Sequence, residues 1–249
     1  MKFIDETVEK IAQNSKVAQE IWKDFAHDKK LCECFHLRPT GSGITIISML
    51  PYAPMRGLRD VNPDKLNDEL KKLARETGRL LGVDVDKALE IMVKSGFIDE
   101  EYRTNRSGVW KEDNAQALFI KGMILKHDMY EGIDFVASEL ALAGKSTRFD
   151  IVGYKDDDLY IFEMKKDRNQ KGFEQVAGYA AMINNNKEIF LKVLSKSPYC
   201  PVSDFKKVHA IAVMRYAVNS ATQVENSAKK AGVGLWYYER SITLRKITL

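Results

Sequence analysis

One stretch in the second half of the chain constrains its fold more than any other. Two apolar segments, Arg148–Tyr154 and Leu159–Lys166, flank a four-residue polar run that contains three consecutive aspartates. Short apolar segments joined by a polar turn predict a β-hairpin. A third segment, Phe135–Leu142, precedes them across the turn Gly144-Lys145-Ser146. We therefore expect three successive strands.

Helical patterns surround these three segments. The spacing of apolar residues predicts a helix before them, over Trp110–His127, and another after them, over Lys171–Asn184. The remaining segments predict a strand at Val208–Met214, a helix at Ala221–Ala231 and strands at Gly234–Tyr238 and Ile242–Ile247. This order indicates an α/β (α+β) fold, with a mixed sheet flanked by helices.

The first half of the chain has a different character and reads as mainly helical. Helical spacing covers residues 3–28, and acidic residues open further predicted helices at 63–81 and 86–94. The stretch from about residue 28 to 63 is less regular, with a short strand at Ile44–Ile47. A polar run over residues 102–108 marks a boundary. We predict a helical domain over 1–105, for DNA binding or dimerisation, and a second domain over 106–249.

Composition fits an ordinary globular protein, with 45% hydrophobic and 30% charged residues. No stretch approaches the roughly 18 consecutive apolar residues that span a bilayer, so we expect a cytoplasmic protein. The net charge is +4, and the excess of Lys and Arg lies in residues 106–249. A basic surface suits a polyanion such as nucleic acid.

The three cysteines favour neither a disulfide framework nor a metal site. Their number is odd. Cys32, Cys34 and His36 form a Cys-x-Cys-x-His cluster, but a structural zinc site takes four ligands, usually with two to four residues between paired cysteines. Reduced cysteines without a metal are the favoured interpretation.

The third strand carries the residues that suggest chemistry. Because strand side chains alternate between faces, Leu159, Ile161, Glu163 and Lys165 share one face of it, opposite Tyr160, Phe162 and Met164. Charged groups in such an apolar strand are unfavourable unless they are paired or bind a metal. On the preceding strand Asp150 shares a face with Val152 and Tyr154, and a hairpin brings it opposite Glu163. Two carboxylates beside a lysine suit Mg²⁺ or Mn²⁺.

At these residues the sequence resembles the PD-(D/E)XK nuclease superfamily, the restriction-endonuclease-like proteins. The pattern is an Asp on one strand and Glu-x-Lys on the next, here Asp150 and Glu163-Met164-Lys165, with a Gln and often a Tyr in the following helix, here Gln175 and Tyr179. Phe149 stands where the family usually has Pro. The resemblance covers about residues 110–215. It implies metal ligation by Asp150 and Glu163 and catalytic roles for Lys165 and Gln175.

The resemblance also implies a further acidic metal ligand, and residues near the proposed site in sequence favour a surface for nucleic acid. Glu112, at a helix start, is slightly favoured as the acidic ligand over Glu139 on the first strand. Residues expected to contact nucleic acid are Lys145, Arg148, Lys166, Arg168, Lys171 and Tyr179.

These features together predict a metal-dependent nuclease that hydrolyses phosphodiester bonds, with DNA favoured over RNA and Mg²⁺ or Mn²⁺ as cofactor. A homodimer is compatible with cutting both strands. Two alternatives stay open: a non-catalytic nucleic-acid-binding or complex-assembly module, and a small-molecule hydrolase or transferase on a related sheet. Endo- or exonuclease mode, strand preference and pathway are not determined by the sequence.

Overall fold

A computed structural model describes residues 5–27, 32, 35–49, 112–142, 147–165, 171–215, 221–238 and 245–247. The helices expected at 63–81 and 86–94 and the boundary expected at 105/106 lie outside the described residues. Within the described residues no helix is long and apolar enough to cross a membrane.

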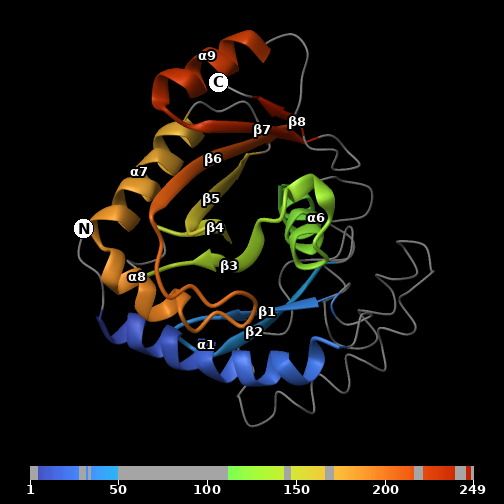
Figure 1. Ribbon diagram of the computed structural model, residues 1–249, viewed down its shortest axis with the longest axis vertical. Helices are drawn as coiled ribbons and strands as arrows, with labels where there is room; N and C mark the ends of the chain where they lie inside the picture. The colour runs from blue at the N-terminus through green and yellow to red at the C-terminus, as the bar shows by residue number, and fades with distance from the viewer. Residues whose placement is uncertain are drawn as a thin grey trace, which may run out of the picture.

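A six-stranded mixed sheet forms the centre of the molecule, in the order β3-β4-β5-β6-β7-β8 (Figure 1). The strands β3 (Asp134–Leu140), β4 (Phe149–Lys155) and β5 (Asp158–Lys165) follow one another as antiparallel neighbours. The strand β6 (Lys207–Arg215) then pairs parallel with β5, and β7 (Gly234–Tyr238) pairs parallel with β6. The short β8 (Arg245–Ile247) closes the edge antiparallel to β7.

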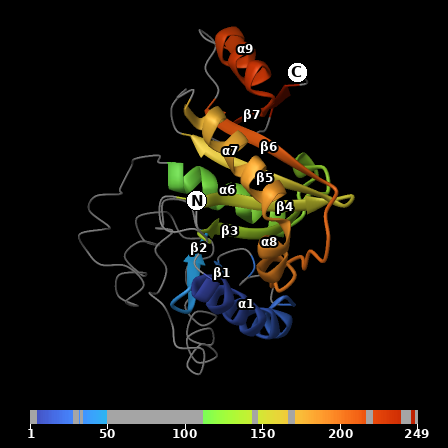
Figure 2. The ribbon, with the colours of Figure 1, turned by 90° about the vertical axis from the view of Figure 1, so that its left-hand side faces the viewer.

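Helices cover both faces of this sheet. The parallel β5–β6 connection runs through α7 (Lys171–Asn185) and α8 (Lys187–Leu194), which lie on the same face of the sheet as α9 (Ala221–Ala231) (Figures 1 and 2). The helix α6 (Glu112–Ile124), followed by the short 3₁₀ helix η1 (Asp128–Tyr130), covers the opposite face. The result is a three-layered α/β arrangement, as the sequence predicts in its coarse form.

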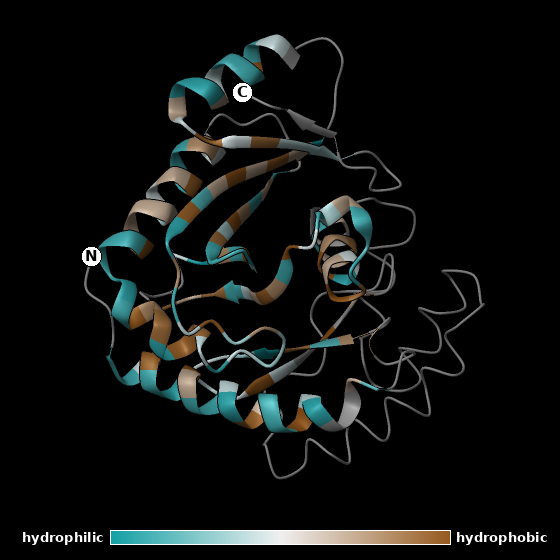
Figure 3. Ribbon diagram, viewed as in Figure 1, coloured by the Kyte–Doolittle hydropathy of each residue, from teal (hydrophilic) through white to brown (hydrophobic). Residues whose placement is uncertain are grey.

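Two apolar cores follow from this layering. Residues such as Val152 and Ile161 pack with Phe173 and Val176 on the face covered by α7. Phe162 and Met164 pack with Phe119 and Ile120 of α6 on the other face. The sheet is accordingly apolar on both faces, and brown segments alternate with paler and teal ones along β5 and β6 in Figure 3. A charged side chain in the middle of such a sheet therefore requires a specific partner.

The described part of the first half packs directly against the second half. It comprises α1 (Asp5–Phe25) and an antiparallel hairpin of β1 (Phe35–Pro39) and β2 (Ile44–Ser48). Val8 and Ile11 of α1 are buried in the same core as residues of β3 and α8. The Tyr199 hydroxyl accepts a hydrogen bond from the Leu37 amide and donates one to the Leu37 carbonyl, which ties β1 to the chain after α8.

The sequence located most elements of the second half within a few residues. It missed α8, which begins a few residues after Asn184, the predicted end of the preceding helix, and it missed β1. The expected strand at Ile44–Ile47 is confirmed as β2. The residues of β1 were expected to be irregular, and this expectation was wrong. β1 was missed because strand formation there depends on pairing with β2 and on contacts with β3.

Candidate active site

The β4–β5 hairpin places Asp150 and Glu163 opposite each other. Ile151 pairs with Phe162 in the antiparallel ladder, so the next positions along the two strands are Asp150 and Glu163. Side chains at directly opposed positions project from the same face of a sheet. The expected register of the hairpin is therefore confirmed.

Asp150 stands at the point where backbone pairing between the two strands ends. Its Oδ2 accepts a hydrogen bond from the amide of Met164 at 2.9 Å. The side chain thus satisfies the next amide of β5 in place of a backbone carbonyl. This bond fixes the position of the Asp150 carboxyl group relative to β5.

The carboxyl group of Asp150 is in an unfavourable environment for a negative charge. Although the residue keeps some exposure, poor hydration of the carboxyl and the nearby Glu163 charge raise its pKa well above the usual range. The Met164 amide and the Lys165 ammonium lower the pKa but do not cancel these effects. Two carboxylates that disfavour each other's charge are a common feature of metal and catalytic sites.

Lys165 lies on the same face as Glu163 and pairs with it. Its Nζ is 2.5 Å from Glu163 Oε1. The Glu163 side chain is 2% exposed, whereas that of Lys165 is 22% exposed. Glu163 therefore lies in the interior of the protein, whereas Lys165 reaches the surface. The predicted division of β5 into two faces is confirmed, since Leu159 and Ile161 belong to one core and Phe162 and Met164 to the other.

The start of α7 packs against Lys165. A Cβ atom at Gly172 would lie 3.0 Å from Lys165 Cγ and 3.4 Å from Lys165 Cε. The absence of a side chain at Gly172 therefore allows the aliphatic part of Lys165 to lie against the helix. Nothing in the sequence pattern identified this residue.

The two polar residues of α7 named by the resemblance contact each other. Gln175 Nε2 donates a hydrogen bond to the Tyr179 hydroxyl at 2.7 Å. Burial raises the pKa of Tyr179, and the charges of Glu163 and Asp150 add to this effect. Tyr179 thus lies within the electrostatic surroundings of the carboxylates, and Gln175 contacts Tyr179.

Tyr179, expected from the sequence to contact nucleic acid, is instead buried. It is 6% exposed and belongs to the core, with its ring centroid 4.6 Å from that of Phe149. Phe149, which stands where the resembled family usually has Pro, thus packs against it. A tyrosine buried in this way is better placed to support Gln175 than to contact nucleic acid.

Glu139 lies beside Asp150 on the neighbouring strand, β3. Ser138 pairs with Ile151 and Leu140 with Phe149, which places Glu139 across from Asp150. The Glu139 charge contributes to the raised pKa of Asp150. Of the two acidic residues considered from the sequence, Glu139 is therefore shown to be close to the site. Glu112 is the first residue of α6, and its side chain lies outside the described residues.

Glu139 is held by three side chains. Its Oε2 is 3.0 Å from Arg38 Nη1 and 2.8 Å from Arg148 Nη1. Its Oε1 accepts a 3.4 Å hydrogen bond from Gln116 Nε2, which also donates to the Asp150 backbone carbonyl at 3.1 Å. Gln116 and Arg38 were not predicted from the sequence, because only the tertiary structure brings α6 and β1 to β3. The one signal in the sequence was that Gln116 is a polar residue within the apolar part of the predicted helix.

The other predicted nucleic-acid contacts are not placed by the structure. Lys145, Lys166 and Arg168 lie outside the described residues, as does the side chain of Lys171 at the start of α7. Arg148 is described, and its side chain is 55% exposed while it pairs with Glu139.

The carboxylates of Asp150 and Glu163 are oxygen donors that suit a hard divalent cation with few protein ligands. Mg²⁺ is commonly bound by one or two carboxylates together with water and substrate phosphates. Asp150 and Glu163 supply two such carboxylates, and a bound cation would offset the burial and the Glu163 charge that raise the pKa of Asp150. No group of three or more His, Cys, Asp and Glu side chains suited to a metal is found in the described part of the chain. His36, from the Cys-x-Cys-x-His cluster, instead has its Nε2 3.0 Å from the Ser138 hydroxyl.

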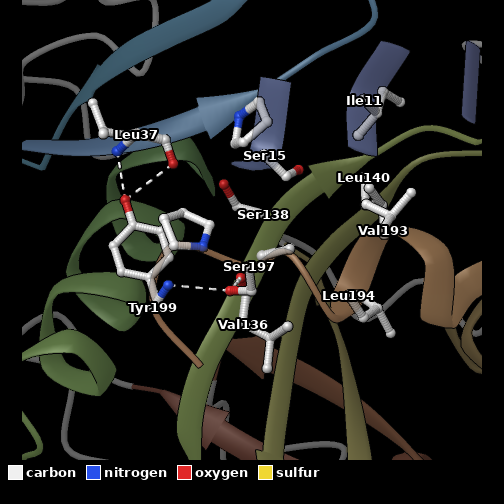
Figure 4. A pocket seen from close by; sticks show the side chains of 13 residues that line it. Ile11, Ser15, Leu37, Val136, Ser138, Leu140, Val193, Leu194, Ser197 and Tyr199 are labelled. Atoms are coloured by element: carbon white, nitrogen blue, oxygen red, sulfur yellow. Dashed lines mark hydrogen bonds between the residues drawn. The ribbon is translucent and has the colours of Figure 1, made fainter. Parts of the chain in front are cut away.

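A small apolar cavity lies between α1, β1, β3 and α8 (Figure 4). Its volume of about 20 Å³ is enough for about one water molecule. Asp150, Glu163 and Lys165 do not line it. This cavity therefore cannot hold a small-molecule substrate next to Asp150, Glu163 and Lys165.

Comparisons with protein-family models, with curated proteins and with solved structures find no match to this chain.

Proposed function

We propose that this protein is a metal-dependent nuclease that hydrolyses phosphodiester bonds, with DNA as the favoured substrate. One observation carries the proposal: Asp150 and Glu163 face each other across a hairpin, in an apolar sheet, with Lys165 beside them. The order α6-η1-β3-β4-β5-α7-α8-β6 also contains the helix, three strands, helix and strand of the restriction-endonuclease-like core that the sequence resembles.

Each residue has a defined task in this proposal. Asp150 and Glu163 would hold Mg²⁺ or Mn²⁺, and the bound metal would neutralise phosphate charge and activate a water molecule. The Lys165 ammonium orients the attacking water or stabilises the negative charge that develops on the phosphate. Gln175, with its amide group held by Tyr179, supports substrate or water next to these residues.

The apolar environment explains why the site uses these residue types. Glu163 is almost completely buried, and electrostatic interactions are stronger where water is excluded. The Asp150 carboxyl is fixed by the Met164 amide before any ligand binds. Such preorganisation avoids the rearrangement that solvent would require during the reaction.

The test is cleavage of linear duplex, circular and single-stranded DNA with Mg²⁺, Mn²⁺ or EDTA. Wild type is compared with Asp150→Asn and Lys165→Ala. Asp158→Asn is the matched control, since Asp158 is a carboxylate at the opposite end of β5 that pairs with His209. We expect metal-dependent cleavage that falls by roughly 100-fold or more in the first two variants and is retained in the control. The preferred substrate identifies the mode of cutting.

Two other outcomes contradict the proposal in different ways. Binding of DNA by wild type and variants alike, without cleavage, supports a non-catalytic nucleic-acid-binding or complex-assembly module. Cleavage that is equally strong in Asp150→Asn shows that another site performs the reaction.

A further inference from the structure

Glu139 connects three elements next to the candidate active site. Arg38 reaches it from β1, Arg148 from the position before β4 and Gln116 from α6. We call these four residues the Glu139 cluster. Gln116 links the cluster to the Asp150 backbone carbonyl. Gln116 therefore joins the Glu139 carboxylate to the strand that contains Asp150.

The backbone of Glu139 is held in an uncommon conformation. Its φ is +53°, a left-handed value that residues other than glycine rarely adopt. Such a conformation persists where the surroundings hold it in place. The contacts with Arg38, Arg148 and Gln116 provide these surroundings.

The two arginines differ in their exposure. The Arg38 side chain is 17% exposed, close to the 12% of Glu139, whereas the Arg148 side chain is 55% exposed. Both contact the same oxygen of Glu139. Arg148 can therefore turn toward solvent while Arg38 still neutralises the carboxylate. Removal of Arg38 instead leaves the poorly hydrated Glu139 carboxylate paired with Arg148, whose side chain is largely in contact with water.

Arg38 is also carried by a firmly attached strand. The neighbouring His36 is fully buried and bonds through Nε2 to the Ser138 hydroxyl of β3. Leu37 exchanges two hydrogen bonds with the Tyr199 hydroxyl. These contacts fix the strand segment that leads into Arg38.

We propose that Arg38 is a positioning residue that holds Glu139, and through Gln116 the Asp150 strand, while Arg148 exchanges Glu139 for a phosphate of the nucleic-acid backbone. This inference rests on the proposed function and deepens it. It assigns the hairpin from the first half of the chain a task in building the site. Arginine suits the exchange, because its planar guanidinium binds carboxylate and phosphate alike.

The experiment separates DNA binding from cleavage. Affinity for a short DNA duplex is measured in EDTA at several salt concentrations, and the single-turnover cleavage rate is measured with Mg²⁺ at saturating DNA. The variants are Arg38→Gln, Arg38→Lys and Arg148→Gln. Lys192→Gln, which breaks the exposed pair with Glu9, is the control. Melting temperatures verify folding, and Arg38→Lys keeps the test valid if Arg38→Gln does not fold.

We expect Arg148→Gln to bind DNA about tenfold more weakly, with a salt slope smaller by about 1, as for the loss of one phosphate contact. Arg38→Gln should keep its affinity within about twofold and lose at least about tenfold in cleavage rate, and Arg38→Lys should recover part of that rate. Equal effects of both arginines on affinity and salt slope would overturn the assignment, as would a wild-type cleavage rate in Arg38→Gln.

Failure of the proposed function gives a different result. If wild type binds DNA and cuts nothing, the nuclease proposal fails, but the affinities still decide between the two arginines. A weakening confined to Arg148→Gln then supports the exchange. A weakening shared by Arg38→Gln overturns it.

Discussion

At the scale of single residues, the site combines groups that destabilise one another. Asp150 faces Glu163 across the hairpin, and burial together with the Glu163 charge raises the pKa of Asp150. An acid whose pKa is raised on folding binds a proton in the folded state that the unfolded state has lost. Stability therefore falls as the pH rises from the ordinary Asp range toward the raised pKa. At neutral pH the metal-free protein is less stable because of Asp150.

Asp150→Asn is thus expected to stabilise the metal-free protein. Asn keeps an oxygen for the Met164 amide and removes the charge. In EDTA at pH 7 the free energy of unfolding, as measured by urea denaturation, should be higher for the variant than for wild type, because the raised pKa of Asp150 makes its charge unfavourable in the folded state. Mg²⁺ should raise the melting temperature of wild type and not that of the variant. A less stable variant in EDTA would contradict this account.

His36 makes the opposite contribution at acidic pH. Burial, with a smaller contribution from the Arg38 charge, lowers its pKa to about 3. Below pH 6.5 the unfolded chain binds a proton that the folded protein excludes. Stability from this residue is complete above pH 6.5 and falls as the pH decreases toward 3.

Replacement of His36 should remove this part of the pH dependence. From pH 6.5 to 4 the free energy of unfolding of wild type should fall by up to about 1.4 kcal/mol per pH unit more than that of His36→Gln. Urea denaturation across this range measures the difference. His127→Gln removes an exposed histidine and is the surface control. Parallel curves for wild type and His36→Gln would show that His36 does not titrate as stated.

At the scale of elements, the start of α7 determines where the Lys165 side chain lies. The helix approaches β5 closely because Gly172 has no Cβ. The same helix contains Gly178, where an added Cβ would meet nothing within 4 Å. Alanine substitutions at the two glycines therefore distinguish the effect of helix propensity from the effect of contact with Lys165.

Gly172→Ala should displace Lys165, and Gly178→Ala should not. The first variant is expected to cut DNA about tenfold more slowly, since small misplacements of catalytic groups have large effects on rate. The second should keep the rate and gain about 0.5–1 kcal/mol in free energy of unfolding. Single-turnover cleavage and urea denaturation provide both measurements. Equal rates in the two variants would show that Lys165 accommodates the added methyl group.

At the scale of the whole molecule, the first and second halves share a core. Val8 and Ile11 of α1 are 2% and 3% exposed and pack with residues of β3 and α8. The hairpin β1–β2 brings Arg38 to Glu139. The prediction of domains over 1–105 and 106–249 stays a prediction, and these contacts indicate that the described parts of both halves unfold together.

Ile11→Ala should therefore destabilise the protein as a unit. Its loss of buried methyl groups is expected to lower the free energy of unfolding by about 2–4 kcal/mol, within a single transition seen both by far-UV circular dichroism and by tryptophan fluorescence. Lys16→Ala, at an exposed position of the same helix, should change stability by less than about 0.5 kcal/mol. Two separate transitions would instead show that α1 and the sheet are independent.

The sequence by itself determined the local features of the candidate site. Alternation along the apolar strand assigned Glu163 and Lys165 to one face, and the short polar turn set the register that brings Asp150 opposite Glu163. These inferences succeeded because a strand has a period of two and a tight turn leaves few registers. The helix that carries Gln175 was predicted for a similar local reason.

Only the tertiary structure decided what surrounds these residues. Arg38, Gln116 and Glu139 lie in β1, α6 and β3, and no spacing in the sequence relates them to one another. The burial of Tyr179 against Phe149 likewise depends on how α7 packs on the sheet. Contacts between distant segments arise from the packing of whole elements, whereas periodicity reports only which face of its own element a residue occupies.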